Sequence, residues 1–370
     1  MPENDVMTNK ERFLTALQGG TPDRVPIFDF AFNEASIIKV GEHFTANLPE
    51  LKPFVDCTPV EMRHYFDVYI RIVEALDLDA MVIIFTAGGQ RVGQGNDRFQ
   101  DDFGTTFMLS EHGDPFPVAG PLQTAGDLGR LVLPDPEPYF GIFDYVRARL
   151  PERALIFCVP GPFKFSWNLM GSMENLLLAY GMQPDICLDA ARLTTDYIKT
   201  LINLSIDHGT DAILLDGDVA AQKTTLMSPA HYRKFLKPYH RECVACAHAR
   251  NIPIFKHTDG NFWPVMDDFL ELGFDGLHPI QPQCMDIDEV KEYVDGRVSL
   301  LGNIDCSHLL PHGTETEVVA SVRERVASLA PSGGYILSSS NTIHPGCNPA
   351  NVIAMFRAAR QFGNYPIAIT

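Results

Sequence analysis

The sequence predicts an α/β protein that folds as a single (β/α)8 TIM barrel over residues 1–370, with an N-terminal helix and an insertion between the second and third strands. Three observations predict this fold. Eight short apolar runs alternate with helical segments, as expected of parallel strands joined by crossover helices. Polar residues follow most of the apolar runs, as at the carboxyl edge of a barrel. The glycines after the second run lack the spacing that marks an open nucleotide-binding sheet, which is the alternative fold.

The first half of the chain contains two predicted strands and the insertion. The capping-box spacing of Thr8 and Glu11 predicts a short N-terminal helix. Residues 24–30 and 81–85 are predicted to be buried strands, with a helix over 59–76 between them. Residues 91–138 are rich in Gly, Asp, Phe and Pro and have weak periodicity. This segment therefore predicts an excursion of short strands or loops over one face of the barrel.

Regular alternation resumes in the second half and supplies the other six strands. The strands are predicted over 154–159, 212–215, 252–257, 276–281, 298–305 and 335–337. The helices are predicted over 174–208, 231–250, 265–272, 287–294, 315–329 and 349–362. Eight parallel strands with crossover helices imply a closed barrel.

Composition narrows the class of protein. The net charge of −18 argues against a nucleic-acid partner, since phosphate binding needs clustered Lys and Arg. No apolar run approaches the length of a membrane span, and no signal peptide is visible, so we expect a cytoplasmic protein. The eight cysteines are scattered, which favours reduced thiols. The Cys243 and Cys246 pair lies in a stretch of helical composition, which favours an ordinary helix over a metal or redox site.

The most informative stretch is residues 252–261, an apolar run that ends in polar side chains. His257 and Asp259 are two residues apart and therefore project from the same side of an extended chain. The alternative is structural: Asp259 or Asn261 would cap a following helix, and His257 would be a core residue. The other predicted strands end near Asp29, Thr86, the turn 160–163, Asp216, Asp218, His278, Gln281, Asn303, Asp305 and Asn341, with His344 just beyond.

Two kinds of chemistry fit these strand ends. The first is a divalent metal, expected to be zinc, bound by imidazole and carboxylate with an open position for substrate. The second is acid/base catalysis by paired carboxylates such as Asp216 and Asp218, although Asp-Gly-Asp also fits a tight turn. The leading metal ligands are His257 and Asp259, and the candidates for the remaining positions are Asp218, Asn341, His344 and Cys347.

The motifs at these positions resemble the uroporphyrinogen decarboxylase superfamily over nearly the whole chain. They are ERFLTAL at 11–17, DRVP at 23–26, DGDVA at 216–220, HTDGN at 257–261, GLHPIQP at 276–282 and GNID at 302–305. The resemblance implies the same barrel. It also implies one of two activities, since the superfamily contains tetrapyrrole decarboxylases and corrinoid-dependent methyltransferases.

Departures from each branch favour methyl transfer. The decarboxylases carry an arginine-rich motif after the first strand and an aspartate near the second strand end, whereas this chain has residues 29–34 without arginine and Thr86 after Phe85. The thiol-methylating branch holds zinc through a His-x-Cys pair and a later cysteine. Here His257 is retained, Asp259 stands at the first cysteine position, and the later position falls near Asn341, with Cys347 close enough to substitute.

The resemblance therefore implies a methyltransferase of the O-demethylase type. It would move a methyl group from a small donor, such as an aromatic methyl ether, to cobalamin carried by a separate corrinoid protein, because no Asp-x-His-x-x-Gly motif occurs here. The alternatives are a uroporphyrinogen-type decarboxylase and a non-catalytic corrinoid- or tetrapyrrole-binding barrel, and a homodimer is compatible with the sequence.

The methyltransferase hypothesis predicts a role for each candidate site residue. The catalytic residues would be Asp216, Asp218, His278 and Asn303, the substrate-binding residues Asp29, Thr86, Phe163 and Gln281, and the metal ligands His257, Asp259, Asn341, His344 and Cys347. Aromatic residues between Phe85 and Phe165 are more often core, but they could also line an apolar pocket. Those singled out are Phe99, Phe103, Phe107, Phe116, Phe163 and Phe165.

Overall fold

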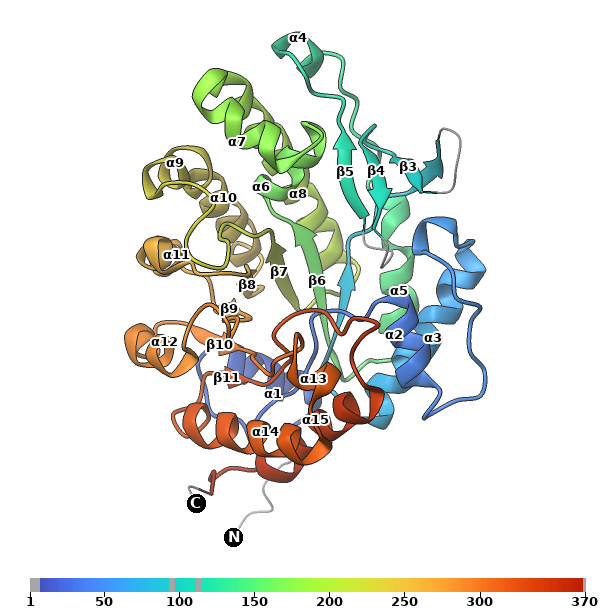
Figure 1. Ribbon diagram of the computed structural model, residues 1–370, viewed down its shortest axis with the longest axis vertical. Helices are drawn as coiled ribbons and strands as arrows, with labels where there is room; N and C mark the ends of the chain where they lie inside the picture. The colour runs from blue at the N-terminus through green and yellow to red at the C-terminus, as the bar shows by residue number, and fades with distance from the viewer. Residues whose placement is uncertain (1–6, 93–96, 111–114, 369–370) are drawn as a thin grey trace.

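A curled, parallel seven-stranded sheet forms the centre of the protein, and Figure 1 shows helices packed around it. The computed structural model describes residues 7–92, 97–110 and 115–368. The strand order is β1-β6-β7-β8-β9-β10-β11, so the strands follow one another around the sheet in chain order. Their bounds are β1 Ala80–Ile84, β6 Ala154–Pro160, β7 Ala212–Asp216, β8 Ile254–His257, β9 Gly276–His278, β10 Ser299–Leu301 and β11 Tyr335–Ile336.

The predicted strand over residues 24–30 is not a regular strand. It joins both edges of the sheet by a few isolated contacts. Leu337 N donates to Pro26 O at 3.0 Å and Phe28 N donates to Leu337 O at 3.2 Å, while Asp79 N donates to Ile27 O at 2.7 Å. One reason for the missing ladder is Pro26, which has no N–H to donate. The segment nevertheless lies between β11 and the start of β1 and places Asp29 at the carboxyl edge of the sheet.

Apolar side chains fill the inside of the curled sheet. Val82, Ile156, Leu214 and Phe255 alternate with outward-facing residues and form one buried cluster. The helix α1 (Asn9–Leu17) begins at the predicted capping box of Thr8 and Glu11 and adds Phe13 and Leu17 to that cluster. Helix α1 contacts β1, β6, β10 and β11, and Ser299 Oγ at the start of β10 donates to Ala16 O at 2.8 Å, so α1 covers the amino end of the sheet.

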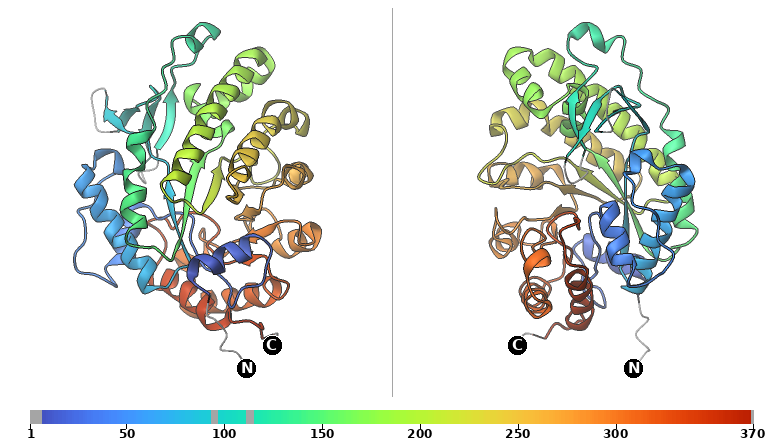
Figure 2. Two further views of the ribbon diagram at one scale, coloured as in Figure 1. Left: turned by 180° about the vertical axis from the view of Figure 1, so that it is seen from behind. Right: turned by 45° about the vertical axis from the view of Figure 1, so that its right-hand side comes forward.

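The outer helices cover the other face of the sheet, as the two views of Figure 2 show. They are α2 Glu34–Gly41, α3 Pro59–Ala75, α5 Gly141–Arg147, α6 Pro162–Leu169, α7 Met173–Met182, α8 Pro184–Asp207, α9 Pro229–Phe235, α10 Lys237–His248, α11 Met266–Leu272, α12 Ile287–Val294, α13 Leu309–His312, α14 Glu315–Leu329 and α15 Pro349–Phe362. The short 3-10 helices are η1 Phe54–Asp56, η2 Glu137–Phe140 and η3 Trp263–Val265.

Proline accounts for two of the differences from the predicted helices. The single helix predicted over 174–208 is divided before Pro184, and the one predicted over 231–250 is divided before Pro238. The helices over 287–294, 315–329 and 349–362 have the predicted bounds. Helices α2, α5 and α6 were not predicted.

The insertion between β1 and β6 forms a small antiparallel sheet beyond the carboxyl ends of those strands (Figure 1). Its strands are β2 Gly89–Arg91, β3 Arg98–Asp101, β4 Thr106–Leu109 and β5 Pro115–Ala119, followed by α4 Ala125–Leu128. Leu122 N donates to Leu169 O at 2.9 Å, which ties the insertion to the end of α6. The excursion predicted over 91–138 is thus a sheet that begins two residues earlier, and its residues 93–96 and 111–114 lie outside the described part of the chain.

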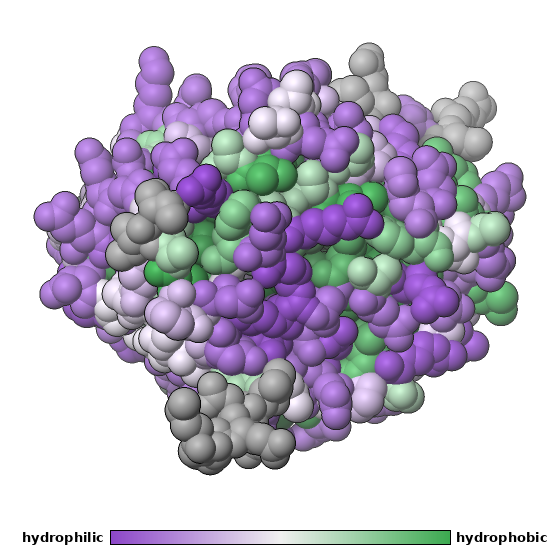
Figure 3. Space-filling model, turned by 90° about the horizontal axis from the view of Figure 1, so that it is seen from below, coloured by the Kyte–Doolittle hydropathy of each residue, from purple (hydrophilic) through white to green (hydrophobic). Residues whose placement is uncertain are grey.

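The surface seen from below is mainly hydrophilic, with hydrophobic side chains exposed in patches between the polar ones (Figure 3). Among the described residues, no helix is both long and apolar enough to cross a bilayer.

Candidate functional site

Two carboxylates and an imidazole converge after β7 and β8. The parallel pairing of Leu215 with Lys256 brings the loop after β7 beside the end of β8. His257 Nε2 lies 3.9 Å from Asp218 Oδ1 and 3.9 Å from Asp259 Oδ1. The loops are locked together because Asp259 N donates to Asp218 Oδ1 at 2.8 Å. We call Asp218, His257 and Asp259 the triad group.

Asp259 has one oxygen satisfied and one left without a partner. Its Oδ2 accepts a hydrogen bond from Asn341 Nδ2. Its Oδ1 is buried and meets no hydrogen-bond donor among the described residues. Burial, followed by the nearby charges of Asp218 and Asp216, raises the pKa of Asp259 to about 8. The site therefore holds a carboxyl group that either keeps a proton near neutral pH or needs a cation.

His257 is held between an aromatic ring and a second imidazole. Its ring stacks on Phe30, with centroids 4.2 Å apart and an interplanar angle of 10°. Its Nδ1 lies 2.8 Å from Nδ1 of His278. Burial lowers the pKa of both histidines, that of His278 well below its ordinary value. Both rings are therefore neutral near pH 7, and His257 Nε2 faces the two carboxylates.

Two lysines near the triad group, which were not predicted from the sequence, supply positive charge at the ends of β7 and β8. Lys164 Nζ donates to Asp216 Oδ2 at 2.6 Å; burial alone would raise the pKa of Asp216, but the lysine outweighs it and the net shift is downward. The fully buried Lys256 Nζ donates to the carbonyls of Leu215, Gly217 and His257 at 2.6 to 3.2 Å. The position of Lys256 inside the apolar run 252–257 could have indicated from the sequence that this lysine is buried and bound to polar groups.

Several predicted site residues hold loops at the same edge. Asp29 is fully buried and accepts hydrogen bonds from Ser339 Oγ at 2.9 Å and from Phe30 N at 2.9 Å. Asn303 Nδ2 donates to Ile280 O at 2.7 Å. Gln281 Oε1 accepts from Gly260 N at 3.0 Å, which fixes the turn after Asp259. These contacts position the loops around the triad group.

His344 and Cys347, two of the predicted metal ligands, lie outside the triad group. His344 Nε2 is 2.9 Å from Cys306 O, so it must donate there, and its Nδ1 accepts from Gly346 N at 3.1 Å. Both ring nitrogens are therefore engaged. The Cys347 thiol faces the same Cys306 carbonyl, and burial raises its pKa to about 12. The structure instead brings Asn341 to the group through its contact with Asp259.

The predicted substrate-binding residues Thr86 and Phe163 lie in different places. Thr86 lines an apolar cavity, whereas Phe163 is buried against Trp167 and is not part of the cavity wall. The singled-out phenylalanines also pack elsewhere: Phe99 stacks on Phe107, and Phe103 packs against Phe165. The phenylalanines that line the cavity are Phe32, Phe54, Phe66, Phe85, Phe140 and Phe143.

The triad group fits a divalent cation. One ligand atom from each of its three residues lies within 4.8 Å of the others. The two 3.9 Å separations slightly exceed the roughly 3.4 Å expected between tetrahedral ligands of zinc, a gap that small side-chain movements close. The unpartnered Oδ1 of Asp259 is the kind of buried acceptor that a cation satisfies. Nitrogen and oxygen ligands suit zinc and harder divalent metals.

Comparisons with known proteins agree on a family of enzymes. The sequence model of the family described as Uroporphyrinogen decarboxylase (URO-D) matches residues 97–362. Uroporphyrinogen decarboxylase of Coxiella burnetii (strain RSA 493 / Nine Mile phase I) is 27% identical over 264 residues, covering 66% of this chain and 69% of the relative. The methylcobamide:CoM methyltransferase MtaA of Methanosarcina barkeri is 23% identical over 347 residues, 93% of each chain.

A solved structure with a similar fold covers almost the whole chain. The methyltransferase from Methanosarcina mazei matches with a TM-score of 0.70 at 22% identity, over 96% of this chain and 99% of that one.

Proposed function

The chain belongs to the uroporphyrinogen decarboxylase (URO-D) family, and from that premise we propose that it is a methyltransferase that moves a methyl group between a small donor and the cobalt of a separate corrinoid protein. The proposal includes a closed (β/α)8 barrel in one domain, with residues 24–30 as its irregular eighth strand. It also includes a zinc-class ion bound by the triad group. A cytoplasmic location and a homodimer remain predictions.

The triad group is the observation that carries the proposal. Methyl transfer from oxygen, nitrogen or sulfur requires stabilisation of the electron pair left on that heteroatom. Asp218, His257 and Asp259 offer one nitrogen and two carboxylate oxygens at the carboxyl edge, and one of these oxygens lacks a partner. The methyltransferase relative also aligns over 93% of the chain, more than the 66% covered by the Coxiella decarboxylase.

Residues of this chain would orient the groups that take part in methyl transfer. The methyl carbon leaves its heteroatom, which keeps the electrons of the broken bond, and bonds to the reduced cobalt of the partner. A metal bound by the triad group would act as a Lewis acid for that heteroatom. Without a metal, Asp259 can donate a proton from its carboxyl group, since its pKa is about 8. Asn341 orients Asp259, and His278 fixes the ring of His257.

Decarboxylation is the second candidate, because relatives in the same family are decarboxylases. The charges at the carboxyl edge disfavour it. A substrate with several carboxylates needs free cations, whereas Lys164 is paired with Asp216 and Lys256 is used by three backbone carbonyls. Asp218 and Asp259 add negative charge to the same region.

Metal content tests the proposal. Elemental analysis of the wild type should find about one zinc-class ion per chain, and His257→Ala should lose it. Asp305→Ala is the matched control, because Asp305 lies at the same edge and its side chain contacts the local turn, accepting from Ser307 N and His308 N and lying 3.6 Å from His308 Nδ1. A wild type without metal that releases carbon dioxide from uroporphyrinogen would refute methyl transfer in favour of decarboxylation.

A further inference from the structure

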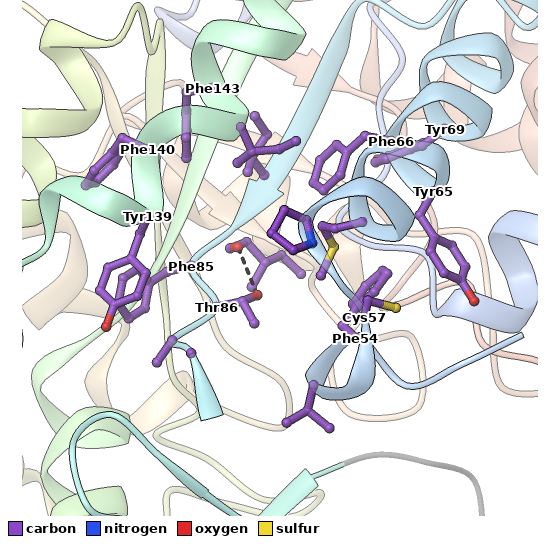
Figure 4. A pocket seen from close by; sticks show the side chains of 18 of the residues that line it. Phe54, Cys57, Tyr65, Phe66, Tyr69, Phe85, Thr86, Tyr139, Phe140 and Phe143 are labelled. Atoms are coloured by element: carbon purple, nitrogen blue, oxygen red, sulfur yellow. Dashed lines mark hydrogen bonds between the residues drawn. The ribbon is translucent and has the colours of Figure 1, made fainter. Parts of the chain in front are cut away.

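An apolar cavity of about 440 Å³ lies at the carboxyl end of β1, which is three places from β8 in the sheet order. Its walls come from η1, α3, the end of β1, η2 and α5, with side chains pointing inward as Figure 4 shows. Small-molecule sites typically have volumes of about 300–1,000 Å³. The cavity is therefore large enough for a compact organic ligand.

The cavity wall carries no formal charge. Among the described residues that line it, none is Asp, Glu, Lys, Arg or His. The wall is made chiefly of phenylalanine and tyrosine rings with Ile37, Met62 and Ile142 between them. A charged ligand would lose its hydration there without compensation, while an aromatic ring would gain contact with the aromatic side chains. The occupant that fits is an uncharged ring.

Polar atoms on the wall are largely occupied by the protein itself, except the buried Tyr69 Oη, which meets no hydrogen-bond partner among the described residues. Tyr139 donates to Asp102 Oδ2 at 2.8 Å, and Tyr65 donates to the carbonyl of Glu50 at 2.9 Å. Thr86 Oγ1 donates to Ile84 O at 3.3 Å, the contact marked in Figure 4. The wall therefore selects mainly by shape and apolarity rather than by hydrogen bonds.

The inserted sheet closes one side of the cavity. Gly88 and Gly89, at the start of β2, line it. Two contacts hold this sheet against the cavity: Arg91 Nε donates to Asp56 Oδ1 at 2.7 Å, and Tyr139 bonds to Asp102. The insertion thus supplies part of the binding wall.

One short segment of the chain connects the cavity wall with the triad group. Ala31 and Phe32 line the cavity, and Phe30, the preceding residue, stacks on His257. We propose that the cavity binds the uncharged aromatic ring of a small molecule. Its role as the pocket for the body of the methyl donor rests on the proposed function, whereas its affinity for such rings does not.

Direct binding to the purified full chain tests the proposal. Calorimetry and ligand-observed NMR should detect toluene and methoxybenzene, and benzoate should bind at least tenfold more weakly. Met62→Trp and Ala87→Phe, which add bulk to the wall, should each reduce methoxybenzene affinity at least tenfold. Val60→Trp is the matched control for Met62→Trp: it lies on the same helix α3, its side chain is 72% exposed, and it should leave affinity unchanged.

The outcomes separate this proposal from the proposed function. Benzoate binding as tightly as methoxybenzene, or affinity unchanged in both filling variants, would overturn the cavity as an aromatic site. Toluene binding in a protein that transfers no methyl group would support the cavity and count against methyl transfer. A methoxybenzene KM unaffected by both filling variants in an active enzyme would overturn the cavity's role as donor pocket.

Discussion

The Nδ1 atoms of His257 and His278 lie 2.8 Å apart, so one ring carries a proton there and the other accepts it. If His257 Nε2 is to bind a cation, its proton must sit on Nδ1 and point at His278. His278 Nδ1 is then the acceptor and Nε2 carries the proton of that ring. In this arrangement His278 accepts from the tautomer of His257 that leaves a lone pair facing Asp218 and Asp259, and the buried Nε2 of His278 meets no partner among the described residues.

The first prediction concerns this pair. His278→Ala removes the acceptor and should weaken zinc binding by about 10–100-fold, the usual effect of losing a partner behind a metal-binding histidine. Competition with a chromogenic chelator measures the affinity. His240→Ala is a suitable control, because His240 is equally buried but bonds to Tyr232 rather than to the triad group. Equal affinities for wild type and His278→Ala would contradict the tautomer argument.

The second prediction concerns Asp259. Asp259→Ala should lower metal affinity by at least 100-fold, because it removes an anionic ligand atom. The metal-free variant should be as stable as the metal-free wild type or more so, because the unpartnered Oδ1 no longer has to be buried. Urea denaturation with and without chelator measures both effects. A metal-free variant that is markedly less stable would show that Asp259 serves the fold and not a cation.

The third prediction concerns the pH dependence of Asp29. Burial raises its pKa to about 7, so the folded protein keeps this proton after the unfolded chain has lost it. The contribution of Asp29 to stability is therefore greatest below about pH 4, falls as the pH rises to 7, and is constant above that. The difference in urea midpoint between wild type and Asp29→Asn should change over this range. A difference independent of pH between 4 and 7 would refute it.

The fourth prediction compares two lysines that donate to backbone carbonyls. Lys256→Met leaves three buried carbonyls at the ends of β7 and β8 without this donor and should cost about 3 kcal/mol of stability. Lys291→Met removes one contact, to Gly333 O, and should cost about 1 kcal/mol. Chemical denaturation of both variants checks the ratio. Equal losses would mean that Lys256 does not hold the two strand ends together.

The alternation of apolar runs and helical segments was sufficient to predict the parallel sheet, because the hydrophobic period and the length of each run can be read from the local sequence. The strand predicted over residues 24–30 was harder to predict. The segment has the composition of a strand, but Pro26 lacks an N–H for a strand ladder, and Asp29 instead accepts a hydrogen bond from Ser339. The breaks before Pro184 and Pro238 are signalled locally, because proline disfavours the helical conformation at the residue before it. The start of the inserted sheet at Gly89 depends on pairing with Asp101, which no local pattern shows.

In the site too, some features follow from the local sequence and others depend on contacts between distant parts of the chain. The side on which His257 and Asp259 project follows from strand geometry, and the structure places both beside Asp218. Which further residues join them depends on loop paths. His344 is turned toward Cys306, and Asn341 is turned toward Asp259, although both follow the same strand. Phe30 stacks on His257 from a segment more than 200 residues away, a contact that spacing alone cannot reveal.

The measurement that tests the central claim most directly is methylation of reduced cobalamin by a methoxybenzene donor, followed by the absorbance of the cobalt centre. Wild-type protein supplied with zinc should form methylcobalamin. Asp218→Ala combined with Asp259→Ala should reduce the rate by at least 100-fold, while Asp305→Ala should retain it. Methylation at the wild-type rate by the double variant would contradict the account, because the triad group would then have no part in methyl transfer.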